Sequence, residues 1–392
     1  MALSLRNFLA TARAALTVPA AERSLPLTFV VGNESADIDS ICSALVLAYL
    51  RTNAAPRTLH IPLTNIPRAD LGLRTEMTAV LRHAGLAPSD LLTLCDLPDQ
   101  LRLEDTRWLL VDHNSLTGRL ARFSGRVTGC IDHHANEDVV PPDASPRVIE
   151  PCGSCMSLVI EESKGLWEEL ASRQDEPISI TEQANLAKLG LAAILIDTIN
   201  LTAEAKIRDK DRTAAAFLES KLQGDPTFTS SLFHSINSVK EDISSLGFRD
   251  VLRKDYKEWT EGSIRIGISS VPQGLDYLID DKAKGSADDF AAAVSSWAKE
   301  RTLDLVAVMT TSNLDGEFRR DLLAWALSGR GEKTLASFAA ASSHELQLET
   351  YAGGRLDEGD RRVAWRQRNL AASRKQVAPL IRDAARPVSL EL

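Results

Sequence analysis

Carboxylate and imidazole side chains gather at the ends of short apolar segments in the first half of this sequence. In chain order they are Asp37 and Asp39 after residues 27–32, Asp112 at the end of 107–112, Asp132, His133 and His134 at the end of 126–132, and Asp197 after 191–196. Each segment has the length and apolar character of a buried element. The polar groups that follow are therefore candidates for one shared site.

So many carboxylates in one place raise one another's pKa unless cations neutralise them. Divalent metal ions are the usual counter-charge, and mixed Asp and His ligands suit Mg²⁺, Mn²⁺, Co²⁺ or Fe²⁺ better than a closed zinc site. Paired ions activate water and stabilise an in-line displacement at phosphorus. The residue types thus predict a metal-dependent phosphohydrolase. Each pair alone has a simpler interpretation, since Asp37 could cap the helix expected near Ser40.

The elements that must position these groups alternate between strand and helix. Strands are expected at 27–32, 58–61, 107–112, 126–132 and 147–150, and helices at 40–50, 74–84, 154–163 and 181–196. This alternation is typical of an α/β fold with a mostly parallel sheet flanked by helices. Because the carboxyl ends of parallel strands line the ligand crevice, such a sheet brings the polar groups to one edge.

The second half reads as a smaller α/β unit. Strands are expected at 263–271 and 303–310, and helices at 287–300 and 333–342. A polar stretch follows residue 198 and is interrupted by Gly224-Asp225-Pro226, which is typical of a domain boundary. We therefore expect a first domain at residues 1–212, a linker at 213–227 and a second domain at 228–392.

The charge of the chain disfavours nucleic acid as a partner, and its hydropathy disfavours a membrane. The formal net charge is −9, which repels a phosphate backbone, and no apolar run approaches the roughly 18 residues of a membrane span. Basic residues nevertheless concentrate near the C-terminus, at Arg361, Arg362, Arg366, Arg368, Arg374, Lys375, Arg382 and Arg386. This basic island predicts a local anion-binding surface, although a solvated helix face explains it equally well.

Cysteine usage and the N-terminal segment bear on location. The five cysteines are widely spaced, and the CxxC pair of Cys152 and Cys155 lacks the second pair of a structural zinc site. A reducing cytoplasm is therefore expected. Residues 1–21 contain two arginines, no acid and an apolar stripe. This pattern fits a helix packed on the protein body and, less well, a mitochondrial presequence.

Four segments of the first half resemble, in order, the motifs of the DHH phosphoesterase superfamily: VVGNESADIDS (30–40), LLVDHN (109–114), CIDHHANE (130–137) and LIDTINLT (195–202). Two later segments resemble its DHHA2-type C-terminal domain: VLRKDYKEW (251–259) and ASRKQVAP (372–379). That domain is shared by fungal exopolyphosphatases, prune-like proteins and manganese-dependent inorganic pyrophosphatases. The sequence is most similar to the fungal cytosolic exopolyphosphatases, and the resemblance implies an active site in the cleft between the two domains.

The resemblance also implies roles for individual residues. One metal ion would be held by Asn33, Asp37 and Asp112, and a second by Asp39, Asp112, His133 and Asp197, with Asp112 as the bridge. The phosphates of the substrate would be contacted by His134, Lys257, Arg374 and Lys375. Asp132 would orient the two histidines. The catalytic set is thus Asp112, Asp132 and His134.

Asn33 stands where the pyrophosphatases of this superfamily have a histidine ligand. An amide oxygen is a harder ligand than imidazole, so the exchange should favour Mg²⁺ over Mn²⁺ or Co²⁺. The resemblance therefore implies two divalent ions, Mg²⁺ or Mn²⁺, with Co²⁺ as a further candidate.

The implied activity is release of orthophosphate from the ends of inorganic polyphosphate, with nucleoside polyphosphates as further candidate substrates. An inorganic pyrophosphatase is disfavoured by Asn33, and a prune-like cyclic-nucleotide phosphodiesterase by the intact Asp132-His133-His134. A catalytically idle interaction protein on the same fold should have lost acidic ligands that are all present here. We expect the chain to be a monomer.

Overall fold

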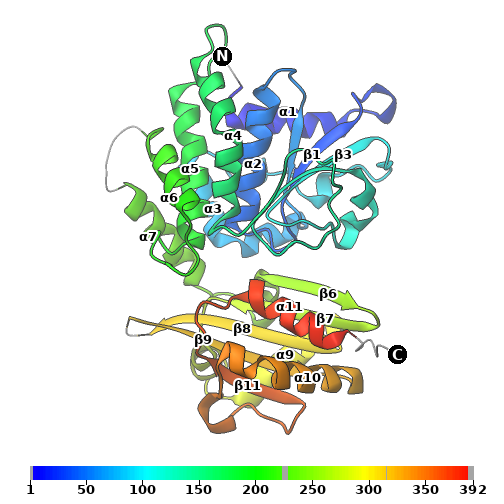
Figure 1. Cartoon of the computed structure of the whole chain (residues 1–392), viewed down its shortest axis with the longest axis vertical. Helices are drawn as coiled ribbons and strands as arrows, with labels where there is room; N and C mark the ends of the chain where they lie inside the picture. The colour runs from blue at the N-terminus through cyan, green and yellow to red at the C-terminus, as the bar shows by residue number, and fades with distance from the viewer. Residues whose placement is uncertain (1–2, 223–227, 315, 387–392) are drawn as a thin grey trace. The chain divides into compact units, whose positions relative to one another are not determined.

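Strands and helices alternate through the first half of the chain, as the sequence predicts (Figure 1). The computed structural model describes residues 3–222, 228–314 and 316–386. The chain forms two units, Met1–Lys240 and Glu241–Leu392. The strands of unit 1 are β1 (Leu27–Val31), β2 (His60–Leu63), β3 (Thr106–Val111), β4 (Val127–Asp132) and β5 (Arg147–Ile149). Its helices are α1 (Leu5–Thr17), α2 (Ile38–Asn53), α3 (Thr75–His83), α4 (Cys155–Ser172), α5 (Ile180–Asp197), α6 (Asp209–Glu219) and α7 (Phe228–Glu241).

The strands of unit 1 pair in the order β2-β1-β3-β4-β5, and every pair is parallel. Helices α2 and α4 pack against this sheet, and α5 packs on both of these helices (Figure 1). Trp108 of β3 stacks on Phe29 of β1 and also contacts Phe123. All five residues of β1 are buried, because a parallel sheet is covered on both faces. The predicted parallel sheet is confirmed.

Helix α1 packs its apolar stripe on the rest of unit 1. The buried residues of this stripe are Leu5, Phe8, Leu9, Ala12 and Leu16. Phe8 meets Tyr49 of α2 edge to face, with 5.5 Å between the ring centroids. The N-terminal segment thus packs on the body of the protein, as the favoured interpretation of its pattern predicts. Among the residues described, no helix combines the length and the apolar character that crossing a membrane requires.

Unit 1 extends further along the chain than the expected boundary at residue 212. Residues 213–219 continue α6, and Phe217 and Leu218 of this helix are buried in the core of the unit. Leu232 and Ile236 of α7 join the same core. The expected linker at 213–227 therefore begins inside a packed helix, and its residues 223–227 lie outside the described residues.

Unit 2 is built on a second, mixed sheet. Its strands are β6 (Tyr256–Glu261), β7 (Ile264–Val271), β8 (Leu305–Leu314), β9 (Glu317–Ala326), β10 (Leu348–Thr350) and β11 (Arg362–Gln367). Its helices are α8 (Phe248–Lys254), α9 (Ala287–Glu300), α10 (Gly329–Leu346) and α11 (Arg374–Ala385). The strand order is β10-β11-β9-β8-β7-β6, and only β7 and β8 pair in parallel among the pairs of this sheet in the described ranges.

Helices cover both faces of the sheet in unit 2. Phe290 and Val294 of α9 belong, with Val308 of β8, to the core on one face. Phe338 of α10 and Ile381 of α11 belong to a second core on the other face. Because both faces are covered, the central strands are apolar on both sides.

Candidate metal centre

The carboxyl ends of β3 and β4 bring predicted acidic and histidine residues together, as a parallel sheet requires. Donor atoms of Asp112, His133 and His134 lie within 4.8 Å of one another, and so do donor atoms of Asp39, His133 and Asp197. The second group adds the first turn of α2 and the last residue of α5. Both groups contain His133. Side chains that are far apart in the sequence thus form one cluster.

Asp112 follows β3 and adopts a left-handed backbone conformation, with φ 61°. This conformation is uncommon outside glycine, although aspartate and asparagine tolerate it. Its N–H donates to the carbonyl oxygen of Ile131 at 3.0 Å, and its Oδ2 accepts from Ser40 Oγ at 2.6 Å. These contacts hold the strained residue with Oδ1 at 3.0 Å from Nε2 of His133.

The spacing between these donor atoms fits a divalent cation. Neighbouring ligands of an octahedral ion, each about 2.1 Å from it, lie about 3 Å apart, and Asp112 Oδ1 and His133 Nε2 are 3.0 Å apart. Nε2 of His133 is also 3.7 Å from Oδ2 of Asp39. All three side chains are buried. Two carboxylates and an imidazole in this arrangement suit Mg²⁺ or Mn²⁺.

Asp39 is held by the beginning of helix α4. Its carboxylate accepts the N–H of Cys155 at 2.7 Å and the N–H of Met156 at 2.9 Å. It also accepts the hydroxyl hydrogen of Ser154 at 3.0 Å. The N–H groups in the first turn of a helix have no partner inside the helix and favour an anion. The loop that leads into α4 therefore sets the direction of the Asp39 side chain.

Hydrogen bonds orient the two adjacent histidines. Nδ1 of His133 is 3.1 Å from the carbonyl oxygen of Cys152, and because a carbonyl only accepts, Nε2 keeps its lone pair for a ligand. Nδ1 of His134 is 2.8 Å from Oδ1 of Asp132. Burial alone would raise the pKa of Asp132, but the charge of His134 and this hydrogen bond outweigh burial and lower it. Asp132 therefore orients His134.

Two residues expected as metal ligands make other contacts. Asp37 caps α2, because its Oδ1 accepts the N–H of Ser40 at 2.9 Å. The side-chain nitrogen of Asn33 donates to Asp112 Oδ2 at 2.8 Å, and its amide oxygen accepts the N–H of Ser35 at 2.8 Å. Among the described acidic and histidine residues, Asp37 belongs to neither of the two groups of candidate ligands. Asn33 holds Asp112 through its side-chain nitrogen, and its role as an oxygen ligand stays a prediction.

The predicted phosphate contacts lie in unit 2. Lys257 is on β6, and Arg374 and Lys375 are the first two residues of α11. Helix α11 packs against β6 and β7. Arg374 forms an ion pair with Asp255, with 2.7 Å between Nη2 and Oδ1.

Arginines of the basic island form ion pairs within unit 2, which lowers the positive charge that the island presents to an anion. Its arginines form ion pairs with acidic residues of unit 2: Arg361 with Glu332, Arg362 with Glu358, Arg366 with Asp321, Arg368 with Glu349, and Arg382 with Glu261. Paired charges cancel much of one another's field. The concentration of basic residues in the sequence therefore does not become an equally positive surface.

Several residues that hold the candidate ligands in place are not among the predicted site residues. Asn114 donates to Oδ2 of Asp132 at 2.6 Å, and Ser40 contacts Asp112 as described above. Ser40 and Asn114 both lie inside the DHH motifs, and this position is the feature of the sequence that could have identified them. Asp211 of α6 contacts the loop before α4 from the other side. It lies in the polar stretch that precedes the expected linker at 213–227.

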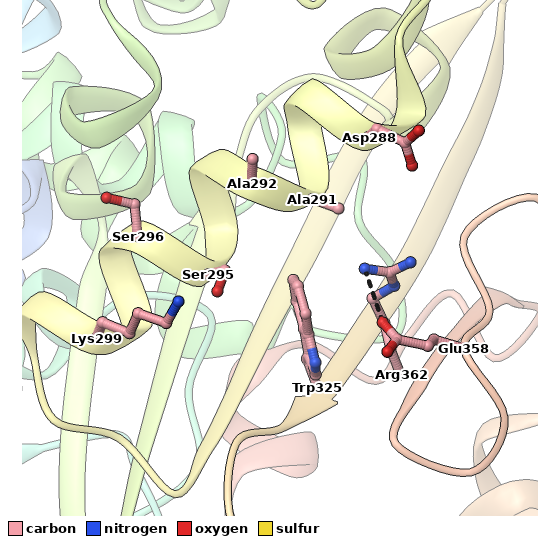
Figure 2. Close-up of a pocket in the computed structure, with 9 residues that line it drawn as sticks. All are labelled: Asp288, Ala291, Ala292, Ser295, Ser296, Lys299, Trp325, Glu358 and Arg362. Atoms are coloured by element: carbon pink, nitrogen blue, oxygen red, sulfur yellow. Dashed lines mark ion pairs between the residues drawn. The ribbon is translucent and has the colours of Figure 1, made fainter.

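A cavity of about 490 Å³ lies in unit 2, and its lining residues include none of the predicted site residues. Side chains of α9, Trp325 of β9 and Arg362 of β11 line it. Figure 2 shows α9 above Trp325, with the ion pair between Arg362 and Glu358 beside it. The guanidinium of Arg362 also lies 4.5 Å from the centre of the Trp325 ring. These contacts engage the charges of Arg362 and Glu358, and Asp288 and Lys299 also line the cavity.

Comparison with known proteins covers both halves of the chain. The profile described as "DHH family, N-terminal domain" matches residues 28–194, and the profile described as "DHHA2 domain" matches residues 234–384. A solved structure described as "putative family II inorganic pyrophosphatase", from Methanococcus jannaschii, has a TM-score of 0.60 at 20% identity. The match covers 92% of this chain and 99% of that one, so the two share a fold.

Three relatives are similar along most of their length. The "Putative exopolyphosphatase" of Schizosaccharomyces pombe is 35% identical, with 98% of this chain and 96% of the relative covered. "Exopolyphosphatase PRUNE1" of Mus musculus is 29% identical, with 97% and 79% covered. The "Manganese-dependent inorganic pyrophosphatase" of Methanothrix thermoacetophila is 24% identical, with 72% and 80% covered. With both profiles matched in order and a 35% identical relative aligned almost end to end, the chain belongs to the DHH family and carries a C-terminal DHHA2 domain.

Proposed function

We propose that this chain is an exopolyphosphatase that releases orthophosphate from the ends of inorganic polyphosphate with the help of two divalent metal ions. The observation that carries the proposal is the cluster of candidate ligands formed by Asp39, Asp112, His133, His134 and Asp197. Further support comes from relatives named exopolyphosphatase that align with nearly the whole chain. Relatives named manganese-dependent pyrophosphatase support a divalent metal.

In this proposal Asp39, Asp112, His133 and Asp197 hold one ion, and Asp112 with Asp37 holds the other. Bound divalent ions lower the pKa of water and neutralise charge on a phosphoryl group. Mg²⁺ and Mn²⁺ both suit this set of ligands. Asn33 fixes the shared carboxylate of Asp112 through the hydrogen bond from its side-chain nitrogen.

The remaining residues act on the phosphate chain. Asp132 holds Nδ1 of His134, so Nε2 is the nitrogen that would contact the scissile phosphate. A positioned donor of this kind stabilises charge that develops during the displacement. We propose that Lys257, Arg374 and Lys375 neutralise further phosphate oxygens, since charge-assisted hydrogen bonds to phosphate are among the strongest.

The experiment that tests this proposal compares three substrates. The purified full-length protein is incubated with Mg²⁺, Mn²⁺ or Co²⁺ and with long-chain polyphosphate, pyrophosphate or cyclic AMP. Released orthophosphate or AMP is measured, and the remaining polyphosphate is sized on a gel. We expect rapid phosphate release from polyphosphate, chains that shorten from their ends, and no activity after chelation of the metal.

Other outcomes would contradict the proposal in distinct ways. Faster hydrolysis of pyrophosphate than of polyphosphate would assign the protein to the pyrophosphatases. Hydrolysis of cyclic AMP would point to a phosphodiesterase. Inactivity with all three substrates and all three metals would favour an interaction protein that keeps the fold.

Replacing Lys375 by alanine is expected to lower kcat/KM for polyphosphate by roughly 10- to 100-fold, because one charge-assisted contact to phosphate is lost. The affinity for Mn²⁺ should stay unchanged, since Lys375 offers no ligand. The matched control is Lys333→Ala, which removes an exposed lysine from α10 in the same unit. Steady-state kinetics and Mn²⁺ titration check both effects. Normal kinetics in Lys375→Ala would remove this residue from the substrate site.

A further inference from the structure

A buried carboxylate outside the predicted site, that of Asp211, accepts five hydrogen bonds. It lies in the first turn of α6 and is 0% exposed. Its Oδ2 accepts the N–H groups of Gly153 and Arg208, at 2.9 Å and 2.8 Å. Its Oδ1 accepts from Ser157 Oγ at 2.6 Å, and from Cys152 Sγ and Ser154 N at 3.2 Å each. A buried charge is costly unless hydrogen bonds satisfy it, and four of these five donors come from residues 152–157.

The contact between Asp211 and this segment is too close for a side chain at position 153. A Cβ atom on Gly153 would lie 2.7 Å from Oδ2 of Asp211 and 2.7 Å from Cγ2 of Thr198. Carbon atoms do not approach other heavy atoms so closely without displacing them. Glycine at this position is therefore what allows the loop to lie against Asp211. The lack of space at Gly153 is an observation independent of the hydrogen bonds, and it indicates the same close contact with Asp211.

The opposite side of residues 152–157 holds two candidate metal ligands. Ser154, Cys155 and Met156 donate to the carboxylate of Asp39. The carbonyl oxygen of Cys152 is 3.1 Å from Nδ1 of His133. The short segment 152–157, which ends in the first turn of α4, thus connects Asp211 with Asp39 and His133.

We infer that Asp211 is a positioning residue for the metal centre, an inference that rests on the proposed function. It fixes residues 152–157 so that their N–H groups aim the carboxylate of Asp39 and the Cys152 carbonyl sets the tautomer of His133. Asp211 itself contacts neither candidate ligand in the hydrogen bonds described above. Its effect passes through the loop, as the effect of outer-shell partners on metal ligands commonly does.

The chemistry of the contact requires a carboxylate at position 211. Both oxygens accept hydrogen bonds, three on Oδ1 and two on Oδ2. An asparagine has nearly the same volume but only one acceptor oxygen, so its NH₂ group would face hydrogen-bond donors wherever it points. Asp211→Asn therefore changes the hydrogen bonds without creating a large cavity.

The test is Mn²⁺ binding to the full-length protein, measured by calorimetry and by the electron paramagnetic resonance signal of free Mn²⁺. Asp211→Asn is expected to weaken binding by roughly 10- to 100-fold, which is the usual effect of removing an outer-shell partner. Ser157→Ala removes only one of the five hydrogen bonds and should weaken binding less. The matched control is Asp209→Asn, which removes the same charge from an exposed position in the same turn and should bind normally.

The dependence of activity on Mn²⁺ concentration distinguishes a positioning role of Asp211 from a general loss of stability. In Asp211→Asn, the curve of polyphosphatase activity against Mn²⁺ concentration should shift to higher concentration, with most of kcat recovered at saturation. A merely structural role would lower the unfolding temperature of the metal-free protein and leave the Mn²⁺ affinity of the folded protein unchanged, which would overturn the inference.

Other outcomes of the Mn²⁺ measurements also test the role of Asp211. If Asp211→Asn does not fold, Ser157→Ala carries the test, and normal Mn²⁺ affinity in that variant would overturn the inference. A wild-type protein that binds no Mn²⁺ would overturn the proposed metal centre together with the role of Asp211. Equal binding by wild type and folded Asp211→Asn would overturn only the role of Asp211.

Discussion

Asparagine in place of Asp112 is expected to lower kcat/KM for polyphosphate by about 1,000-fold or more. Loss of an outer-shell partner already costs about 10- to 100-fold in metal affinity or activity, and Asp112 is proposed as a charged ligand shared by both ions. Its Oδ1 lies 3.0 Å from Nε2 of His133 in the centre of the cluster. Kinetics at saturating metal and titration with Mn²⁺ measure the loss of turnover and the loss of metal affinity separately.

The fold should survive this change, because asparagine can keep the contacts of Asp112. Its oxygen can accept from Asn33 Nδ2 and Ser40 Oγ, as Oδ2 of Asp112 does at 2.8 Å and 2.6 Å. Its NH₂ group would then face Nε2 of His133, which has a lone pair to accept it. Asparagine also tolerates the left-handed backbone at φ 61°. Without metal, the variant should unfold at the same temperature as wild type or higher, since a cluster of like charges loses one charge.

Asp138→Asn is the matched control for this variant. Asp138 also has a left-handed backbone, with φ 57°, but its side chain is exposed. Kinetics and Mn²⁺ affinity should both match wild type. An Asp112→Asn protein that keeps more than about a tenth of the activity and binds Mn²⁺ normally would contradict the bridging role of Asp112.

The sequence predicted elements well where local pattern and tertiary burial agree. Helix α9 was expected at 287–300 and spans Ala287–Glu300, because Ser286 caps it and one face alone is apolar. Strand β9 was not expected. Its residues Leu322, Leu323 and Ala324 are all buried because helices cover both faces of the sheet, so the alternation that identifies a strand is absent.

Helix α6 was missed for the opposite reason. Its first turn, which begins at Asp209, is charged, and its apolar residues come late, at Ala214, Phe217 and Leu218. The charged start therefore had the composition of a linker. What makes it part of unit 1 is tertiary: Asp211 is buried against residues 152–157, a contact that no local pattern reveals.

In the metal centre, too, the sequence pattern predicts which residues come together, but only the structure reveals their individual contacts. The convergence of acidic and histidine side chains can be predicted, because the carboxyl ends of parallel strands lie at one edge of the sheet. The contacts of individual side chains cannot be predicted from the strand pattern. Arg374, expected to bind phosphate, pairs with Asp255, which is 119 residues away in the sequence. The direction of the Asn33 amide likewise depends on Asp112, 79 residues away.

The two adjacent histidines should respond differently to the same substitution. His133→Gln is expected to weaken Mn²⁺ binding by more than the roughly 10- to 100-fold of an outer-shell change, because Nε2 of His133 belongs to both groups of candidate ligands. His134→Gln is expected to lower kcat by about 100- to 1,000-fold, as the loss of one donor to a developing charge does, with Mn²⁺ affinity close to wild type. The pair serves as its own control, since size, position and substitution are matched.

The comparison is informative because the geometry permits His134 a second role. His134 belongs with Asp112 and His133 to a group of candidate ligands, and its Nδ1 lies 3.7 Å from Oδ1 of Asp112 as well as 2.8 Å from Oδ1 of Asp132. A nitrogen engaged with a carboxylate orients the ring, so the opposite nitrogen does the chemistry, toward a metal or toward phosphate. If His134→Gln weakens Mn²⁺ binding as much as His133→Gln does, His134 is a ligand and the phosphate contact must come from another residue. If only turnover falls, His133 binds the metal and His134 stabilises the charge that develops on the scissile phosphate.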